Sequence, residues 1–147
     1  MVRVVQTAMS FIWVGMLGGI SFLEAPLKFR APGITLGLGL GIGRLVFQVM
    51  NMVEIVFAVI LAATFLIARR DRGLPFYLFV GVAVLLALQT FWLLPELDIR
   101  AEMVIRGESP PGSNTHIVYI VFELLKILTL LVMGILISKR SFNAPDR

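Results

Sequence analysis

The chain has 147 residues and a net charge of +4, and 59% of its residues are hydrophobic while only 15% are charged. A soluble domain carries about 25% charged residues, so this composition, with a mean hydropathy of +0.95, is typical of a chain whose solvent is lipid. The absence of cysteine excludes disulfides, iron–sulfur clusters, thiolate metal sites and covalently attached c-type haem.

The first predicted transmembrane span covers about residues 4–27. It is too long for the core of a signal peptide, and no small-residue cleavage site follows it. Gly15 and Gly19 lie four residues apart, a spacing that lets two helix backbones approach closely. We therefore expect a retained helix that packs tightly through these glycines.

A loop is predicted from Pro26 to about Gly41, and it contains the glycine-rich run Gly37–Gly43. Glycine weakens a helix by about 1 kcal/mol per residue relative to alanine. We interpret the run as a flexible lead-in whose glycines let the next helix pack closely. The alternative is a re-entrant segment that lines a cavity.

Three further spans follow, and each ends at a recognisable stop signal. Arginines with glycine and proline end the second span, Pro95 ends the third, and Lys139 and Arg140 end the fourth. A polar loop is expected over 96–114, rich in turn-forming residues at its end. The predicted spans are 44–68, 76–94 and 115–137, which makes 1–140 one all-α, four-helix transmembrane domain with a tail at 141–147.

The distribution of lysine and arginine predicts the orientation of the bundle, because cytoplasmic loops are enriched in both. We interpret these basic residues as topology determinants, so no nucleic-acid partner is expected. Both termini are predicted to be cytoplasmic, in what we take to be a bacterial inner membrane. The predicted cytoplasmic side carries Arg3, Arg69, Arg70, Arg72, Lys139, Arg140 and Arg147, and the other side carries Lys28, Arg30, Arg44, Arg100 and Arg106.

Polar side chains form one stripe on each of two predicted spans. Ionisable residues inside a bilayer cost a few kcal/mol each and are usually functional. Steps of three and four residues keep them on one helix face. The stripes are Arg44, Gln48, Asn51 and Glu54 on the second span, and His116, Tyr119, Glu123 and Lys126 on the fourth.

The two stripes descend through the bilayer together, because both helices run in the same direction. Glu54 and Lys126 fall at the same depth near mid-membrane, so we expect them to form an ion pair for which Glu123 competes. Ser21, Glu24 and Gln89 on the other spans fall in the same outer half. The sequence therefore predicts a polar pocket that opens outward and is closed toward the cytoplasm.

Structural roles are the alternative for each residue of this predicted site. Arg44 and His116 would meet lipid headgroups, Glu24 would cap a helix end or face water, and Tyr119 would belong to the aromatic belt. Glu54, Glu123 and Lys126 would fix helix register as an ion-pair network. Asn51 and Gln89 would act as interhelical hydrogen bonds.

The sequence gives only weak indications of a metal site or of a nucleophilic catalytic site. His116 lies about 10 Å along the helix from Glu123, too far for both to bind one ion. No metal ligand is therefore assigned, and haem held by two histidines would need a second subunit. No serine or cysteine nucleophile stands in a recognisable setting with a base.

Two loose patterns cover most of the chain: Phe22-x-x-x-Pro26-x-Lys28-Phe29, and Leu94-Pro95-x-x-Asp98-x-Arg100, Gly107 and His116-x-x-Tyr119-x-x-x-Glu123-x-x-Lys126. In these the chain resembles small four-span bacterial membrane proteins of unknown function. In size and layout alone it is also similar to small four-span proteins of the anthrone-oxygenase type. The resemblance implies a four-span fold and no particular activity.

The leading functional hypothesis is binding, with transport as an extension, of a small ligand or ion at the polar pocket. An accessory subunit of a larger membrane complex is the alternative, and a cofactor-free or metal-dependent membrane oxidoreductase is the third. The lipid bilayer is the expected partner, together with a second copy or a larger complex.

Overall fold

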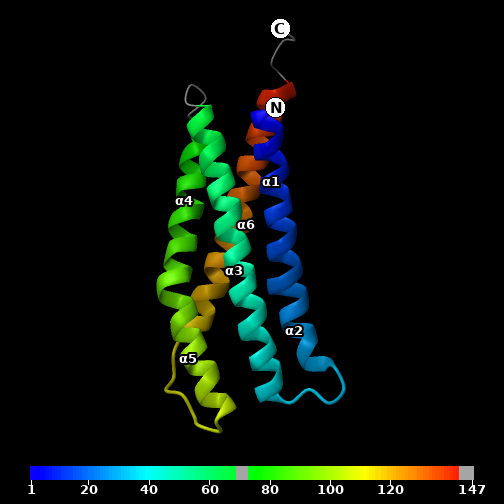
Figure 1. Cartoon of the computed structure of the whole chain (residues 1–147), viewed down its shortest axis with the longest axis vertical. Coiled ribbons are helices and arrows are strands. Elements are labelled where there is room, and N and C mark those ends of the chain that lie inside the picture. Colours follow the sequence, from blue (N-terminus) through cyan, green and yellow to red (C-terminus); the bar gives the residue numbers. More distant parts are fainter. Residues whose placement is uncertain (69–72, 143–147) are drawn as a thin grey trace.

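The computed structural model describes residues 1–68 and 73–142, and side chains up to residue 140. Its elements are all helical and form four long helices packed as a bundle (Figure 1). Each is long and apolar enough to cross a membrane: Val2–Arg30, Leu36–Ile67, Leu74–Ile105 and Thr115–Arg140. The predicted arginine-rich stop at residues 69–72 and most of the predicted tail, residues 143–147, lie outside the described residues.

Two of the four helices are interrupted by π-helical segments. The first consists of α1 (Val2–Leu17), the π-helical η1 (Gly18–Glu24), α2 (Ala25–Leu27) and a 3₁₀ turn, η2 (Lys28–Arg30). The third consists of α4 (Leu74–Leu88), the π-helical η4 (Gln89–Leu93) and α5 (Leu94–Ile105). The second and fourth are single helices, α3 (Leu36–Ile67) and α6 (Thr115–Phe142).

Both ends of the described chain lie at the same end of the bundle, and the loops 31–35 and 106–114 lie at the other (Figure 1). We call these the terminal half and the loop half. The helix α6 packs against α1 and α4, and α3 packs against α1, α4 and α5. The core of the terminal half is mainly apolar, with Leu61, Val82, Leu130 and Met133 fully buried, and its buried polar side chains are the uncharged Gln6, Ser10 and Thr64. Large apolar side chains cover the outside of the helices, as lipid contact requires.

The run Gly37–Gly43 is not the predicted flexible lead-in, because it forms the first turns of α3, but the close packing expected of its glycines is confirmed. The Thr35 hydroxyl caps the helix by accepting a hydrogen bond from the Leu38 amide at 3.2 Å. The lack of a side chain at Gly39 lets the Phe29 ring pack against the helix, because a Cβ at this position would lie 2.6 Å from Cδ1 of Phe29. These contacts offset the low helix propensity of glycine.

Gly15 and Gly19 do not make the expected close approach within the described chain, because a Cβ at either would meet no atom within 4 Å. The close approach between α1 and α6 lies at Gly134 instead. A Cβ there would lie 3.1 Å from the Phe11 ring and 3.2 Å from Cβ of Ser10. The small residue that permits tight packing is therefore on the fourth helix.

Pro26 and Pro95 do not end their helices, contrary to the expected loops. Each is the second residue of a helical segment that directly follows a π-helical one. Proline lacks the amide hydrogen and collides with the carbonyl four residues earlier in a regular helix. A π-helical turn changes that register, so the helix continues through the proline. The expected polar loop therefore begins only after Ile105.

Candidate functional site

Glu54, Glu123 and Lys126 form a buried cluster at the centre of the bundle, which we call the charged trio. The Lys126 ammonium lies 2.8 Å from Oε1 of Glu123 and also donates to Oε1 of Glu54. All three side chains are 1% exposed or less. The predicted pair between Glu54 and Lys126, with Glu123 as competitor, is confirmed.

Three uncharged donors surround the trio and come from the remaining helices. Trp13 of α1 donates from Nε1 to Oε1 of Glu54 at 3.0 Å. Ser21 of η1 donates to Oε2 of Glu123 at 2.9 Å, and Gln89 of η4 donates from Nε2 to Oε1 of Glu123 at 2.8 Å. Buried charges are tolerated only when such bonds satisfy their lone pairs. All four long helices therefore contribute to the site.

The two π-helical segments bring their polar residues to the same carboxylate. Ser21 lies in η1 and Gln89 in η4, and both donate to Glu123. A π-helical turn rotates the following side chains relative to a regular helix, which is why such turns concentrate at functional sites. Glu123 is thus held from two sides by the irregular parts of the first and third helices.

A cavity of about 740 Å³ lies in the loop half and reaches Glu123. It spans Gly39 to Met52 along α3, about 20 Å at 1.5 Å per residue. Its walls are mainly apolar and aromatic. The lining includes Ser21, Phe22, Ala25, Pro26, Lys28, Phe29, Gly39, Leu40, Gly43, Arg44, Phe47, Gln48, Asn51, Met52, Thr90, Leu94, Pro95, Leu97, Asp98, Ala101, His116, Tyr119, Ile120 and Glu123.

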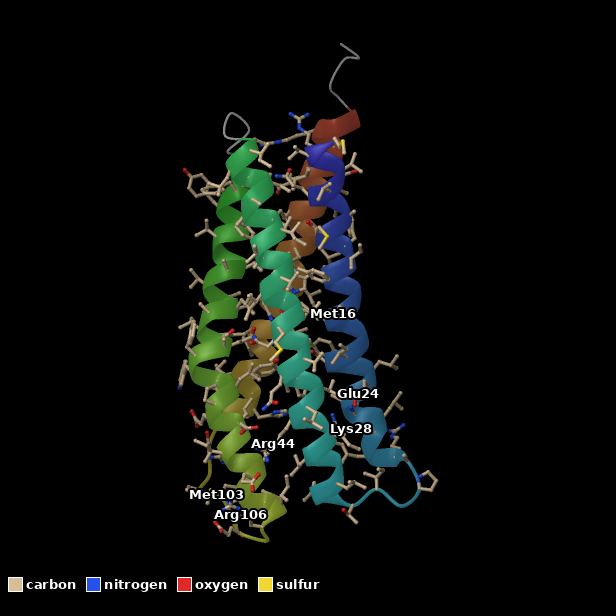
Figure 2. The ribbon with its side chains drawn as sticks, in the orientation of Figure 1. Met16, Glu24, Lys28, Arg44, Met103 and Arg106 are labelled. Atoms are coloured by element: carbon tan, nitrogen blue, oxygen red, sulfur yellow. The ribbon has the colours of Figure 1, made fainter. Side chains whose placement is uncertain are left out.

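Arg44 lies at the edge of this cavity and is held by carboxylates of α5. Its Nε and Nη2 bind the two oxygens of Asp98 at 2.6 and 3.0 Å, and its Nη1 contacts Glu102. Glu102 also pairs with Arg106 at 3.0 Å. Figure 2 shows Arg44 and Arg106 in the loop half of the bundle. This bidentate pairing fixes α3 against α5.

Lys28 carries the second positive charge that lines the cavity. Its ammonium lies 3.3 Å from a carboxylate oxygen of Glu24 and 5.6 and 5.5 Å from the ring centroids of Phe29 and Phe47. Its side chain is 9% exposed. Figure 2 shows Glu24 and Lys28 close together on the first helix, as their ion pair requires. Glu24 therefore neutralises a cation rather than capping a helix end.

The remaining residues of the predicted site lie around the cavity in different roles. Asn51 is buried and donates to the Thr90 hydroxyl at 2.9 Å, an interhelical bond of the predicted kind. Tyr119 is buried with its ring 5.6 Å from that of Phe47. His116 and Gln48 are exposed, and Gln48 makes only a 3.5 Å contact to Asp98.

Sequence reasoning missed Trp13, Thr90 and the carboxylates that hold Arg44. Trp13 lies inside the first apolar span, where an indole shows no periodic signal that marks its N–H as a hydrogen-bond donor. Asp98 and Glu102 fall in the predicted loop 96–114, although their spacing of four residues is that of one helix face. On a helix, this spacing places both carboxylates on the face that contacts Arg44.

No three histidine, aspartate or glutamate side chains of residues 1–68 and 73–142 group closely enough to hold a metal ion. The site is instead a set of ion pairs beside an apolar cavity. The cavity combines apolar and aromatic walls with a small number of polar side chains, among them Glu123.

Comparison with protein-family models, curated proteins and solved structures finds no match for this chain. The resemblance to small four-span bacterial proteins is thus supported only in its coarse form, four helices that can span a membrane.

Proposed function

We propose that this chain is an integral membrane protein that binds a small amphiphilic molecule in the cavity of the loop half. The apolar body of the ligand lies against the aromatic and aliphatic walls, and its polar group reaches Glu123. Most of the predicted site residues line this cavity or contact the charged trio, and Glu24 pairs with Lys28 of the lining. Transport would be an extension of the same binding step.

The observation that carries this proposal is the carboxylate of Glu123 at the inner end of the cavity. Glu123 is 1% exposed, lines the cavity and belongs to the charged trio. The cavity volume of about 740 Å³ lies in the range of small-molecule sites, about 300–1,000 Å³. A few polar groups in an otherwise apolar pocket are the usual composition of such sites.

We further propose a bacterial cytoplasmic membrane as the location, with both termini cytoplasmic and the cavity in the outer half of the bilayer. The asymmetry of lysine and arginine supports this orientation. It gives the cavity access to the outer leaflet and the extracytoplasmic solution, while the apolar core of the terminal half closes it toward the cytoplasm.

Native mass spectrometry of the detergent-purified protein tests the binding proposal. The wild type is expected to retain a small-molecule mass that Ala101→Phe reduces, because Ala101 lines the cavity and the larger ring occupies part of it. Ala63→Phe is the matched control, since Ala63 is exposed on α3 in the terminal half, away from the cavity. It should keep the bound mass.

An equal bound mass in both phenylalanine variants would contradict the cavity as the binding site. The accessory-subunit alternative predicts a different result: the wild-type chain purifies with unrelated polypeptides and carries no small molecule. A visible absorption band of the wild type that follows the bound mass would instead favour the oxidoreductase hypothesis.

A further inference from the structure

We propose that the charged trio holds one exchangeable cation, and that the ligand of the cavity is an amphiphile with a cationic headgroup. When no ligand is bound, the exchangeable cation is a proton shared by Glu54 and Glu123. Binding of the headgroup at Glu123 releases this proton, one per bound cation. This inference rests on the proposed function and names the chemical class of its ligand.

The charge balance of the loop half points to a cation. Lys28 is matched by Glu24, and the two arginines Arg44 and Arg106 are matched by Asp98 and Glu102. The charged trio has two carboxylates and a single ammonium, so it carries a net charge of −1 when both carboxylates are ionised. An unbalanced charge is costly in a buried site, and one proton or one other cation removes the imbalance.

A neighbour of Glu123, the side-chain amide of Gln89, has an acceptor without a donor. Gln89 is 1% exposed and its Nε2 donates to Glu123, but its Oε1 is buried without a hydrogen-bond partner in the described part of the chain. An unpaired buried acceptor costs about 1–3 kcal/mol. A proton on the neighbouring carboxyl group, or an N–H group of a ligand, would supply the missing donor.

Every element packed around Glu123 is consistent with this exchange. The titratable neighbours are Glu54 of α3, and Lys126 and Tyr119 of α6. The first and third helices contribute only the uncharged donors Ser21 and Gln89. Lys28, Arg44, Asp98 and His116 also line the cavity, farther toward the loops.

The walls of the cavity are suited to a cation as well. Lys28 already places its ammonium 5.5 Å from the ring centroid of Phe47 and 5.6 Å from that of Phe29. Phe22 and Tyr119 add two more aromatic side chains to the lining. The faces of such rings carry partial negative charge and attract cations in desolvated sites. An anionic headgroup would meet the net negative charge of the charged trio, whereas the charges of Lys28 and Arg44 are balanced by their carboxylate partners.

Three probes of similar shape and different charge test the inference. They are tetraphenylphosphonium, the neutral triphenylphosphine oxide and the anionic tetraphenylborate. Binding to the detergent-purified protein is measured by isothermal titration calorimetry in two buffers of different protonation enthalpy. The phosphonium cation should bind best and release one proton. While the trio holds its proton, the dissociation constant of the cation should fall about tenfold for each unit by which the pH rises, because binding displaces one proton.

Variants separate the charge of the trio from the shape of the cavity. Glu123→Gln removes the carboxylate at the cavity. Glu54→Gln removes the excess charge without altering the lining, since Glu54 does not line the cavity. Both should weaken binding of the cation and abolish proton release. Glu108→Gln, in the exposed loop, is the control and should behave as the wild type. Melting curves and circular dichroism establish that each variant is folded.

The outcomes distinguish the inference from the proposed function. The inference would be overturned if the cation and the neutral oxide bound equally and no proton was released. If Ala101→Phe also weakened that binding, the cavity would remain the binding site. Preference for tetraphenylborate would overturn it as well. If no probe binds and Ala101→Phe changes no bound mass, the proposed function fails, and the inference fails with it.

Discussion

Lys126 is the residue on which the stability of the buried site depends most. Its ammonium is shared by two carboxylates, so removing it leaves both without a counter-charge. Loss of one member of a buried ion pair costs about 3–5 kcal/mol, because the other member is left unpaired. We expect Lys126→Met to lower the free energy of unfolding by this amount, measured by denaturant titration of the protein in mixed micelles.

The double variant Lys126→Met with Glu54→Gln supplies the control. Removing one carboxylate together with the ammonium should restore part of the lost stability, since the remaining group is closer to neutral. A double-mutant cycle gives the coupling between the two residues directly. Strict additivity of the two effects would show that Glu54 and Lys126 do not interact.

At this scale the sequence predicts charged partners better than neutral ones. Steps of three and four residues placed Glu54 and Lys126 on facing stripes, and the structure pairs them. The spacing could not reveal Trp13, because an indole in an apolar helix is not distinguishable from an ordinary core residue. The spacing includes Gln89 in the predicted site. It could not show that the Gln89 amide donates to Glu123, because this contact depends on the π-helical turn η4.

Among the elements, the start of α3 offers a clear test of why glycine is used there. A Cβ at Gly39 would collide with the Phe29 ring, whereas a Cβ at Gly41 would meet no atom within 4 Å. We expect Gly39→Ala to be less stable than Gly41→Ala by about 1–3 kcal/mol, because overpacking against Phe29 opposes the gain in helix propensity that both variants share. Gly41→Ala should be neutral or stabilising by up to about 1 kcal/mol through helix propensity.

Thermal unfolding of the two alanine variants in detergent checks this prediction. The pair is well matched, because both positions lie in the same turns of α3 and differ in their contacts. If both variants unfolded at the same temperature, the contact of Phe29 with Gly39 would have no energetic importance, and the run would need another explanation.

Helix ends were the least predictable part of the fold. All four apolar segments could be found from hydropathy, because a membrane span requires about 20 apolar residues. Their extents could not, since Pro26 and Pro95 and the glycine run all have the residue types of helix ends. A π-helical turn before each proline and side-chain contacts to the glycines override these local preferences.

For the whole molecule, the proposed orientation can be tested with single cysteines, because the chain contains none. Gly112→Cys lies in the loop between α5 and α6, where a Cβ meets open space. In intact bacterial cells, a membrane-impermeant maleimide should label this residue. A cysteine inserted after Met1, at the opposite end of the bundle, should be labelled only after permeabilisation (Figure 1). The reverse pattern would invert the proposed orientation.

The construction of the charged trio has a consequence for biogenesis. Glu54 is synthesised with the first pair of helices, whereas Lys126 is on the last one, so the acid enters the membrane before its counter-ion exists. Glu123 enters with Lys126 three residues away on the same helix. Trp13, from the same pair as Glu54, is the neutral donor available to that carboxyl group in the meantime. Insertion of the fourth helix is then the step that completes charge pairing, and a chain arrested before it exposes an unmatched acid that membrane quality control can recognise.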